Sequence, residues 1–267
     1  MATATVRSND IFERVEVKYM MDAGKYSAFR AAIDDHMQED AYGLSTICNV
    51  YFDTEDFSLI RTSLDKPVYK EKLRLRSYGV PADDTTVFLE IKKKYDGIVY
   101  KRRTELKCDA AMEYLNGGIA PEPMLSTQIG REIDYFRKLY HPVPKMFIGY
   151  DRIAMFGKED PSLRMTFDFN IRSRNDRLDL RLGDSGRLYS GNNEVLLEIK
   201  VGGAYPIWMV NALNGLKIYP VSFSKYGAVY SSSRDTEKQE NRNKIYAGQM
   251  EKIPAYAHDK RTELVTA

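Results

Sequence analysis

The stretch that decides the fold is residues 69–107, YKEKLRLRSYGVPADDTTVFLEIKKKYDGIVYKRRTELK. Its first part carries a cation at every second position, and alternate residues of a β-strand point to the same face of a sheet. These cations are Lys70, Lys72, Arg74 and Arg76. The spacing therefore predicts a strand that lines one surface with positive charge.

Two further strands follow, joined at Asp96-Gly97. Asp-Gly between two alternating stretches is a strong signal for a two-residue hairpin turn. Counting outward from this turn places Lys92 opposite Lys101, Glu90 opposite Arg103 and Phe88 opposite Glu105. Like charges directly opposite each other destabilise a strand pair, so the lysine pair predicts a multiply charged anion as its partner. The alternative is a row of solvated lysines on an open sheet.

Positive charge is concentrated in this stretch. Residues 69–107 contain eleven Lys and Arg against six Asp and Glu, whereas the whole chain of 267 residues has a net charge of only +2. A general nucleic-acid-binding protein would show a basic excess over the whole chain. We therefore expect no nucleic acid as a partner.

The composition, with 43% hydrophobic residues, indicates a globular protein with a substantial core. We expect one domain over residues 1–233 and a polar tail or surface helix over 234–267. Cys48 and Cys108 lack the spacing of metal ligands, which predicts free thiols in a reducing compartment. The chain shows no apolar run of roughly 20 residues, the length of a membrane span, and its N-terminus lacks the pattern of a signal peptide. These features predict a cytoplasmic protein.

Hydrophobic periodicity predicts alternating strands and amphipathic helices along the whole chain. The expected strands lie near 12–21, 47–53, 69–107, 145–155, 163–171 and 194–201, and the expected helices near 23–37, 109–116, 126–139 and 204–215, with a further helical turn opening at Ser224. In the strand at 163–171 one face is wholly apolar, from Leu163 to Ile171, and the other face is wholly polar.

Strands that are apolar on one face and charged on the other admit two arrangements. The sheet is open and its charged face meets water, or it closes and the charged faces point into a lumen. Glu16, Glu90 and Glu198 recur among the cations, and a metal ion bound together with a polyanion needs both acidic and basic groups. We therefore expect an α+β fold: a closed antiparallel β-barrel tunnel with a charged lumen and amphipathic helices packed outside.

The motifs of common phosphate enzymes are missing from the sequence. It contains no G-x-x-x-x-G-K-[ST] loop and no G-x-G-x-x-G that opens a helix. His36, His141 and His258 stand far apart and beside no obvious nucleophile, so we expect capping or surface roles for them. What remains is phosphate chemistry by positioning, in which cations and a metal ion stabilise charge.

A set of short motifs, in order along the chain, carries a family resemblance. The motifs are Glu16-x-Lys18-Tyr19, Tyr51-Phe52-Asp53, Lys72-x-Arg74-x-Arg76, Glu90-x-Lys92, Lys101-Arg102-Arg103, Tyr150-x-Arg152, Arg164-x-Thr166-x-Asp168, Leu197-Glu198-Ile199-Lys200 and Ser224-Lys225-Tyr226. Together, from about Phe12 to Tyr230, they resemble the VTC (vacuolar transporter chaperone) domain, a family of the triphosphate tunnel metalloenzymes.

This resemblance implies a tunnel of about eight antiparallel strands and a polyphosphate polymerase that adds the terminal phosphoryl group of ATP to a growing chain. By the same resemblance, Glu198 corresponds to the family's metal-binding carboxylate, and its phosphate-binding cations correspond to Lys18, Arg74, Arg76, Lys92, Arg152, Arg164, Lys200 and Lys225. Of these cations, we expect Lys18, Arg74, Arg76, Lys92 and Lys200 to be catalytic and Arg152, Arg164 and Lys225 to bind phosphate. Because they lie on the same strand faces, we also expect Lys72, Lys101 and Arg103 to bind phosphate and Glu16 to hold the metal together with Glu198. The expected ligands are Mn²⁺ or Mg²⁺, ATP and polyphosphate.

The chain also departs from related families. The CYTH triphosphatases carry Glu-x-Glu-x-Lys on the first strand, whereas Arg14 takes the first of these places here, which favours the polymerase branch. Eukaryotic VTC proteins add a regulatory SPX domain and a membrane anchor. We expect neither in this chain, so export of polyphosphate through a membrane would need a separate membrane-protein partner. The sequence carries no signal for oligomeric state, metal preference or product length.

Two other functions compete with the polymerase. A triphosphatase would use water where the polymerase uses a chain end. A non-catalytic polyanion-binding or nucleic-acid-binding module would use the cations alone, with Tyr51, Tyr100 and Tyr150 free to stack bases. Glu16 and Glu198 argue against such a module, because acids on its binding face would weaken the binding of a polyanion.

Three lysines exceed what one triphosphate needs. Lys70, Lys94 and Lys101 lie toward the hairpin and are hypothesised to carry an exit track for the growing chain. Their mutual repulsion, on the order of 1 kcal/mol per close pair, would then be relieved by polyphosphate. The alternative is that they only solvate the hairpin tip.

Overall fold

The computed structural model describes residues 15–189 and 193–235. The strands are β1 (Val15–Asp22), β2 (Met37–Asp53), β3 (Tyr69–Tyr78), β4 (Thr86–Tyr95), β5 (Ile98–Lys107), β6 (Val143–Gly157), β7 (Arg164–Arg174), β8 (Arg187–Leu188) and β9 (Glu194–Val201). The helices are α1 (Ala23–Ile33), α2 (Ser58–Leu64), α3 (Cys108–Leu115), α4 (Glu122–Leu125), α5 (Gln128–Tyr140) and α6 (Ile207–Gly215). Residues 225–235 are also helical, and most of the predicted tail lies outside the described residues.

All strands belong to one antiparallel sheet, which is open. The order is β1-β9-β7-β6-β2-β3-β4-β5, with β8 paired to β7, and within the described residues β1 and β5 are edges that do not pair with each other. The α+β composition agrees with the prediction, but the predicted closed barrel is wrong. The free edge of β1 instead meets the segment after α6, where the Val221 N–H donates to the Lys18 carbonyl oxygen.

The β4–β5 hairpin has the register that the sequence predicted. Asp96 and Gly97 both have positive φ, 44° and 84°, as a type I′ turn requires. The pairs counted from this turn are confirmed: Lys92 with Lys101, Glu90 with Arg103 and Phe88 with Glu105. The like-charged lysine pair is therefore a real feature of the sheet.

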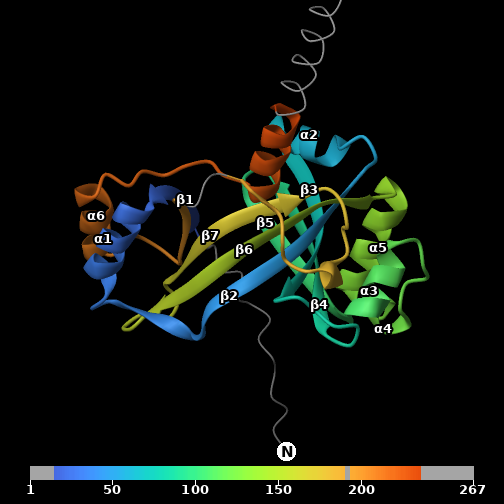
Figure 1. Cartoon of the computed structure of the whole chain (residues 1–267), viewed down its shortest axis with the longest axis horizontal. Coiled ribbons are helices and arrows are strands. Elements are labelled where there is room, and N and C mark those ends of the chain that lie inside the picture. Colours follow the sequence, from blue (N-terminus) through green and yellow to red (C-terminus); the bar gives the residue numbers. More distant parts are fainter. Residues whose placement is uncertain (1–14, 190–192, 236–267) are drawn as a thin grey trace, which may run out of the picture.

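Apolar side chains on the outer face of the sheet form two cores beneath different groups of helices. One core lies under α3 and α5 and includes Val50, Leu73, Leu89, Phe136 and Phe147. The other lies under α1 and α6 and includes Phe29, Ile33, Phe167, Leu197 and Met209. Figure 1 shows α1 and α6 at one end of the molecule and α3, α4 and α5 at the other. Cys48 and Cys108 are buried and free, as predicted.

A third core lies on the inner face, where the 225–235 helix packs. It contains Ile148, Tyr150, Leu196, Tyr226 and Val229, and Figure 1 shows this helix next to α2. None of the described helices is long and apolar enough to cross a membrane.

Ile171 belongs to this inner core, so its predicted place on the outer apolar face is wrong. The β6–β7 pairing shifts its register between Gly149 and Asp151, and Asn170 has a positive φ of 49°. An irregularity of this kind inserts a residue and reverses the side to which the following side chains point. The irregularity therefore explains why the alternation of apolar and polar side chains in β7 does not continue beyond Phe169.

Asp53, at the end of β2, fixes the start of α2 and docks the 225–235 helix. The buried carboxylate accepts hydrogen bonds from the backbone N–H groups of Leu59 and Ile60, at 2.9 and 3.0 Å, and from the Tyr226 hydroxyl at 2.9 Å. These backbone groups are among the first in α2, which have no partner within the helix.

Asp53→Ala should therefore destabilise the protein by at least about 2 kcal/mol, because it removes a helix cap and leaves buried donors without an acceptor. Urea unfolding followed by circular dichroism measures the change. Asp56→Ala is the matched control, because Asp56 is exposed, pairs with exposed Arg61 and accepts a hydrogen bond from the Thr54 hydroxyl. Exposed pairs contribute little to stability. Equal stability of the two variants would contradict this assignment.

Candidate functional site

The charged faces of the strands line one side of the sheet, which we call the cationic groove. Strand pairing puts Arg164, Lys200 and Glu16 in one row, and Glu198 and Lys18 in the next. Lys72, Lys92 and Lys101 form a row on β3, β4 and β5, and Arg74, Glu90 and Arg103 form another. The other predicted residues are Arg76, Arg152 and Lys225, and their contacts below place them in the same groove.

The two ends of the open sheet face each other across this groove. Lys92 on β4 interacts electrostatically with Glu16, Lys18 and Glu198 on β1 and β9, although these strands stand at the opposite end of the strand order. The sheet is therefore strongly curved, and it encloses the charged side chains without closing. Partial loss of hydration in the groove, together with Lys18 and Arg74, lowers the pKa of Lys92 against the pull of Glu16 and Glu198.

Glu198 lies where cations from three elements converge. Lys225 is 3.4 Å from its carboxylate, and Lys18 and Arg152 are each 3.9 Å away. Burial alone would raise the pKa of Glu198, but Lys225, Lys18 and Arg152 outweigh burial and hold it well below the usual range. Glu198 is therefore a fixed anion among cations.

Asp168 is the residue that the sequence analysis missed. It is fully buried and accepts two hydrogen bonds from Arg152, at 2.6 and 2.7 Å, and it pairs with Lys225 at 2.5 Å. Asp168 and Glu198 keep the pKa of buried Lys225 above its ordinary value. The alternation Arg164-x-Thr166-x-Asp168 already placed this acid on the cationic face, and that pattern could have identified it.

Glu90 organises the opposite wall of the groove. Its buried carboxylate pairs with Arg74 at 2.6 Å, Lys101 at 3.4 Å and Arg76 at 3.9 Å. Burial opposes ionisation of Glu90, but Arg74, Arg76 and Lys101 lower its pKa to about 2. One acid here is shared among three cations, so positive charge is in excess.

Arg76 and two tyrosines form the floor of the groove. Arg76 donates to the Asn49 side-chain oxygen and to the Tyr150 hydroxyl, each at 2.9 Å, and Arg74 donates to the Tyr51 hydroxyl at 3.0 Å. Tyr51 also stacks on Tyr226 with ring centroids 4.7 Å apart. Both tyrosines are buried, so their rings are not available to stack bases.

Several cations of the groove have no carboxylate partner within the described part of the chain. The Lys72 amine donates only to the Ser224 hydroxyl, at 3.0 Å. Arg103 lies over the Phe88 ring, 4.6 Å from its centroid. Arg103 and Arg164 are exposed and mark the rim. These side chains are the ones freest to contact an anion.

The groove offers oxygen ligands for a divalent cation. Glu16 and Glu198 each interact with Lys18. Burial and the charge of Glu198 oppose ionisation of Glu16, but Lys18 and Lys200 hold its pKa below the usual value. In the described residues no group of three His, Cys, Asp or Glu forms a complete metal site. Mg²⁺ commonly binds one or two carboxylates together with substrate phosphates and water, so this pair of acids fits a metal that arrives with a phosphate chain.

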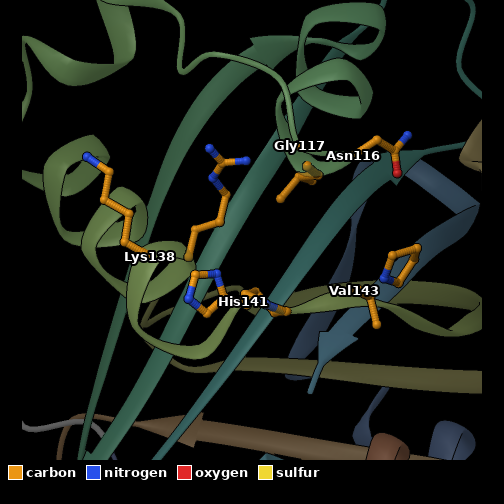
Figure 2. A pocket seen from close by; sticks show the side chains of 9 residues that line it. Asn116, Gly117, Lys138, His141 and Val143 are labelled. Carbon is orange, nitrogen blue, oxygen red and sulfur yellow. The ribbon is translucent and has the colours of Figure 1, made fainter. Parts of the chain in front are cut away.

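A separate pocket of about 500 Å³ lies outside the groove. Figure 2 shows Asn116 and Gly117 on one side of it and His141 and Val143 on the other. None of the predicted site residues lines it. His141 is the C-cap of α5, and His36 stacks on Trp208 with ring centroids 4.3 Å apart, while His258 lies outside the described residues.

Comparisons with known proteins give a family for this chain and a fold similar to its own. A family model described as the VTC domain matches residues 13–234. A proposed adenylate cyclase from Bacillus halodurans has a TM-score of 0.50 and 15% identity, covering 79% of this chain and 93% of its own. A proposed adenylyl cyclase from Hippeastrum, reported to have a dominant triphosphatase activity, has a TM-score of 0.48 and 14% identity, covering 82% and 95%. No curated protein matches the sequence. At 15% identity, the likeness to the Bacillus halodurans protein shows the fold alone.

The groove lysines predict a pH dependence of anion binding. Burial, followed by nearby cations, lowers the pKa of Lys72 to about 8. Partial desolvation lowers the pKa of Lys101, whose side chain is half exposed, to about 8 against the pull of Glu90. A bound anion favours the charged amines and raises both pKa values. Above pH 8 the protein should therefore take up protons when it binds tripolyphosphate, and its affinity should fall by up to about tenfold per pH unit for each lysine.

Calorimetry at pH 9 in two buffers of different ionisation enthalpy measures this proton uptake. The matched control is the double variant Lys72→Arg, Lys101→Arg, because a guanidinium stays charged at this pH. The variant should take up fewer protons and lose affinity less steeply. The same proton uptake in parent and variant would rule out these lysines as its source.

Proposed function

Because the chain belongs to the VTC-domain family, we propose that it is a metal-dependent polyphosphate polymerase that transfers the terminal phosphoryl group of ATP to a growing phosphate chain. The observation that carries the proposal is the excess of cations over carboxylates on one enclosed face, together with an acidic pair at Glu16 and Glu198. A module that only held polyanions would bind more weakly with these acids present.

The reaction needs little covalent chemistry from the protein. A terminal oxygen of the chain attacks the γ-phosphorus of ATP, the bond from that phosphorus to the bridging oxygen breaks, and ADP leaves with that oxygen. Negative charge spreads over the transferred group, so positioned cations are the main requirement. Arg74, Lys92 and Lys72 lie on the groove face of β3 and β4 and are proposed to hold the triphosphate.

Glu198 and Glu16 are proposed to hold the metal, Mn²⁺ or Mg²⁺, which when bound neutralises phosphate oxygens. Asp168 is not proposed as a ligand, because Arg152 and Lys225 already occupy its carboxylate. By fixing both cations, it keeps them next to Glu198. The predicted cytoplasmic location, the membrane-protein partner and the exit track of Lys70, Lys94 and Lys101 stay predictions.

The direct test is to incubate the purified protein with ATP and Mn²⁺ and to measure long-chain polyphosphate and free phosphate separately. We expect polyphosphate and ADP in the parent. Free phosphate without polyphosphate would show that the protein is a triphosphatase and not a polymerase. If neither product forms but the protein still binds tripolyphosphate, the protein is a non-catalytic binding module.

Arg74→Ala should weaken tripolyphosphate binding about tenfold or more, because a charged hydrogen bond to phosphate contributes about 1.5 to 3 kcal/mol. Calorimetry at constant salt measures the affinity. Arg102→Ala is the matched control, since Arg102 lies on β5 of the same sheet but pairs with Glu132 away from the groove. Equal affinity of the two variants would place the triphosphate elsewhere.

Glu198→Gln should abolish turnover, because it keeps the shape of the side chain and removes the charge that binds the metal. A thermal melt checks that the variant folds, and the ATP assay at limiting Mn²⁺ measures its activity. Glu132→Gln, which removes an acid outside the groove, should retain activity. Parental activity in Glu198→Gln would show that the metal is held elsewhere.

A further inference from the structure

Few buried side-chain atoms among the described residues lack a hydrogen-bond partner. They are Glu90 Oε1, Arg137 Nε and Thr166 Oγ1. The Glu90 oxygen lies 3.4 Å from Lys101 and 3.9 Å from Arg76, so its charge is compensated. Arg137 lines the pocket outside the groove. Thr166 is different, because it lies within the groove and nothing compensates its hydroxyl.

Strand register places Thr166 beside the metal-holding acid. On β7 it is paired directly with Glu198 of β9, and on its other side with Ala154 of β6. Side chains paired in this way have Cβ atoms about 4.5 to 5.5 Å apart. The methyl group of Ala154 cannot accept a hydrogen bond, so Glu198 is the directly paired side chain that can.

Glu198 itself is held only by long contacts. The three cations around it lie at 3.4 to 3.9 Å, longer than a good charged hydrogen bond. A carboxylate that gives one oxygen to a metal then needs a donor for the other oxygen, and such partners orient metal ligands in proteins.

We propose that the Thr166 hydroxyl donates a hydrogen bond to Glu198 and holds this carboxylate in its metal-binding orientation, so that Thr166 is a positioning residue. The inference rests on the proposed function in one respect, that Glu198 binds the metal. It explains why a buried hydroxyl, which costs free energy while unpaired, stands at this place on β7.

The test titrates Mn²⁺ into the protein at a fixed concentration of tripolyphosphate and follows the resonance signal of free Mn²⁺, with tripolyphosphate alone as the baseline. Thr166→Val keeps nearly the same shape and removes the hydroxyl, so Mn²⁺ affinity should fall about 10-fold to 100-fold. Thr166→Ser restores a hydroxyl and should bind Mn²⁺ nearly as the parent does. Thermal melts without metal should show no loss of stability in Thr166→Val, because the change removes an unpaired buried group.

Glu198→Gln completes the design and separates two kinds of failure. If it loses Mn²⁺ binding and Thr166→Val does not, the positioning role of Thr166 is wrong while the metal site stands. If Glu198→Gln binds Mn²⁺ as the parent does, the metal is held elsewhere. Glu198 is then not the metal ligand, and Thr166 does not position one. A lower melting temperature of Thr166→Val with unchanged Mn²⁺ affinity would show a purely structural role. None of these readouts depends on whether polyphosphate is made.

Discussion

Asp168 joins three elements of the molecule at the deep end of the groove. Its carboxylate is fully buried and binds Arg152 of β6 and Lys225 of the 225–235 helix. Removing one partner of such a buried pair leaves an uncompensated charge and is strongly destabilising. The contact therefore fixes the helix on the inner face of the sheet, and it sets Lys225 and Arg152 beside Glu198. The electrostatics of the groove depend on this arrangement.

The helix also explains how an open sheet encloses a charged space. Tyr226 stacks on Tyr51 and donates to Asp53, while the preceding segment meets the free edge of β1. Main-chain pairing between β1 and β5 is therefore not needed to bring Lys92 near Glu16 and Glu198. The result is a groove that surrounds an anion yet keeps a rim, at Arg103 and Arg164, where a long chain could pass.

Local patterns predicted much of this structure. The Asp96-Gly97 turn determined the β4–β5 register because hairpin geometry depends on neighbouring residues. Alternation placed the predicted site residues on one face, although their chemical roles stay predictions. Closure could not be predicted in the same way, since it depends on contacts between distant edges, and the expected barrel proved wrong. Ile171 was misplaced because the irregularity at Asn170 has no signature in the apolar pattern.

The central claim is that the groove cations, which outnumber the carboxylates paired with them, bind a phosphate chain together with a metal. The most direct measurement is a crystal structure with tripolyphosphate and Mn²⁺, using anomalous scattering to locate the metal. The account predicts the phosphates in the groove, in contact with Arg74 and Lys92, and the Mn²⁺ peak at Glu198. Phosphates on the outer face, or in the pocket beside His141, with no peak at Glu198, would contradict it.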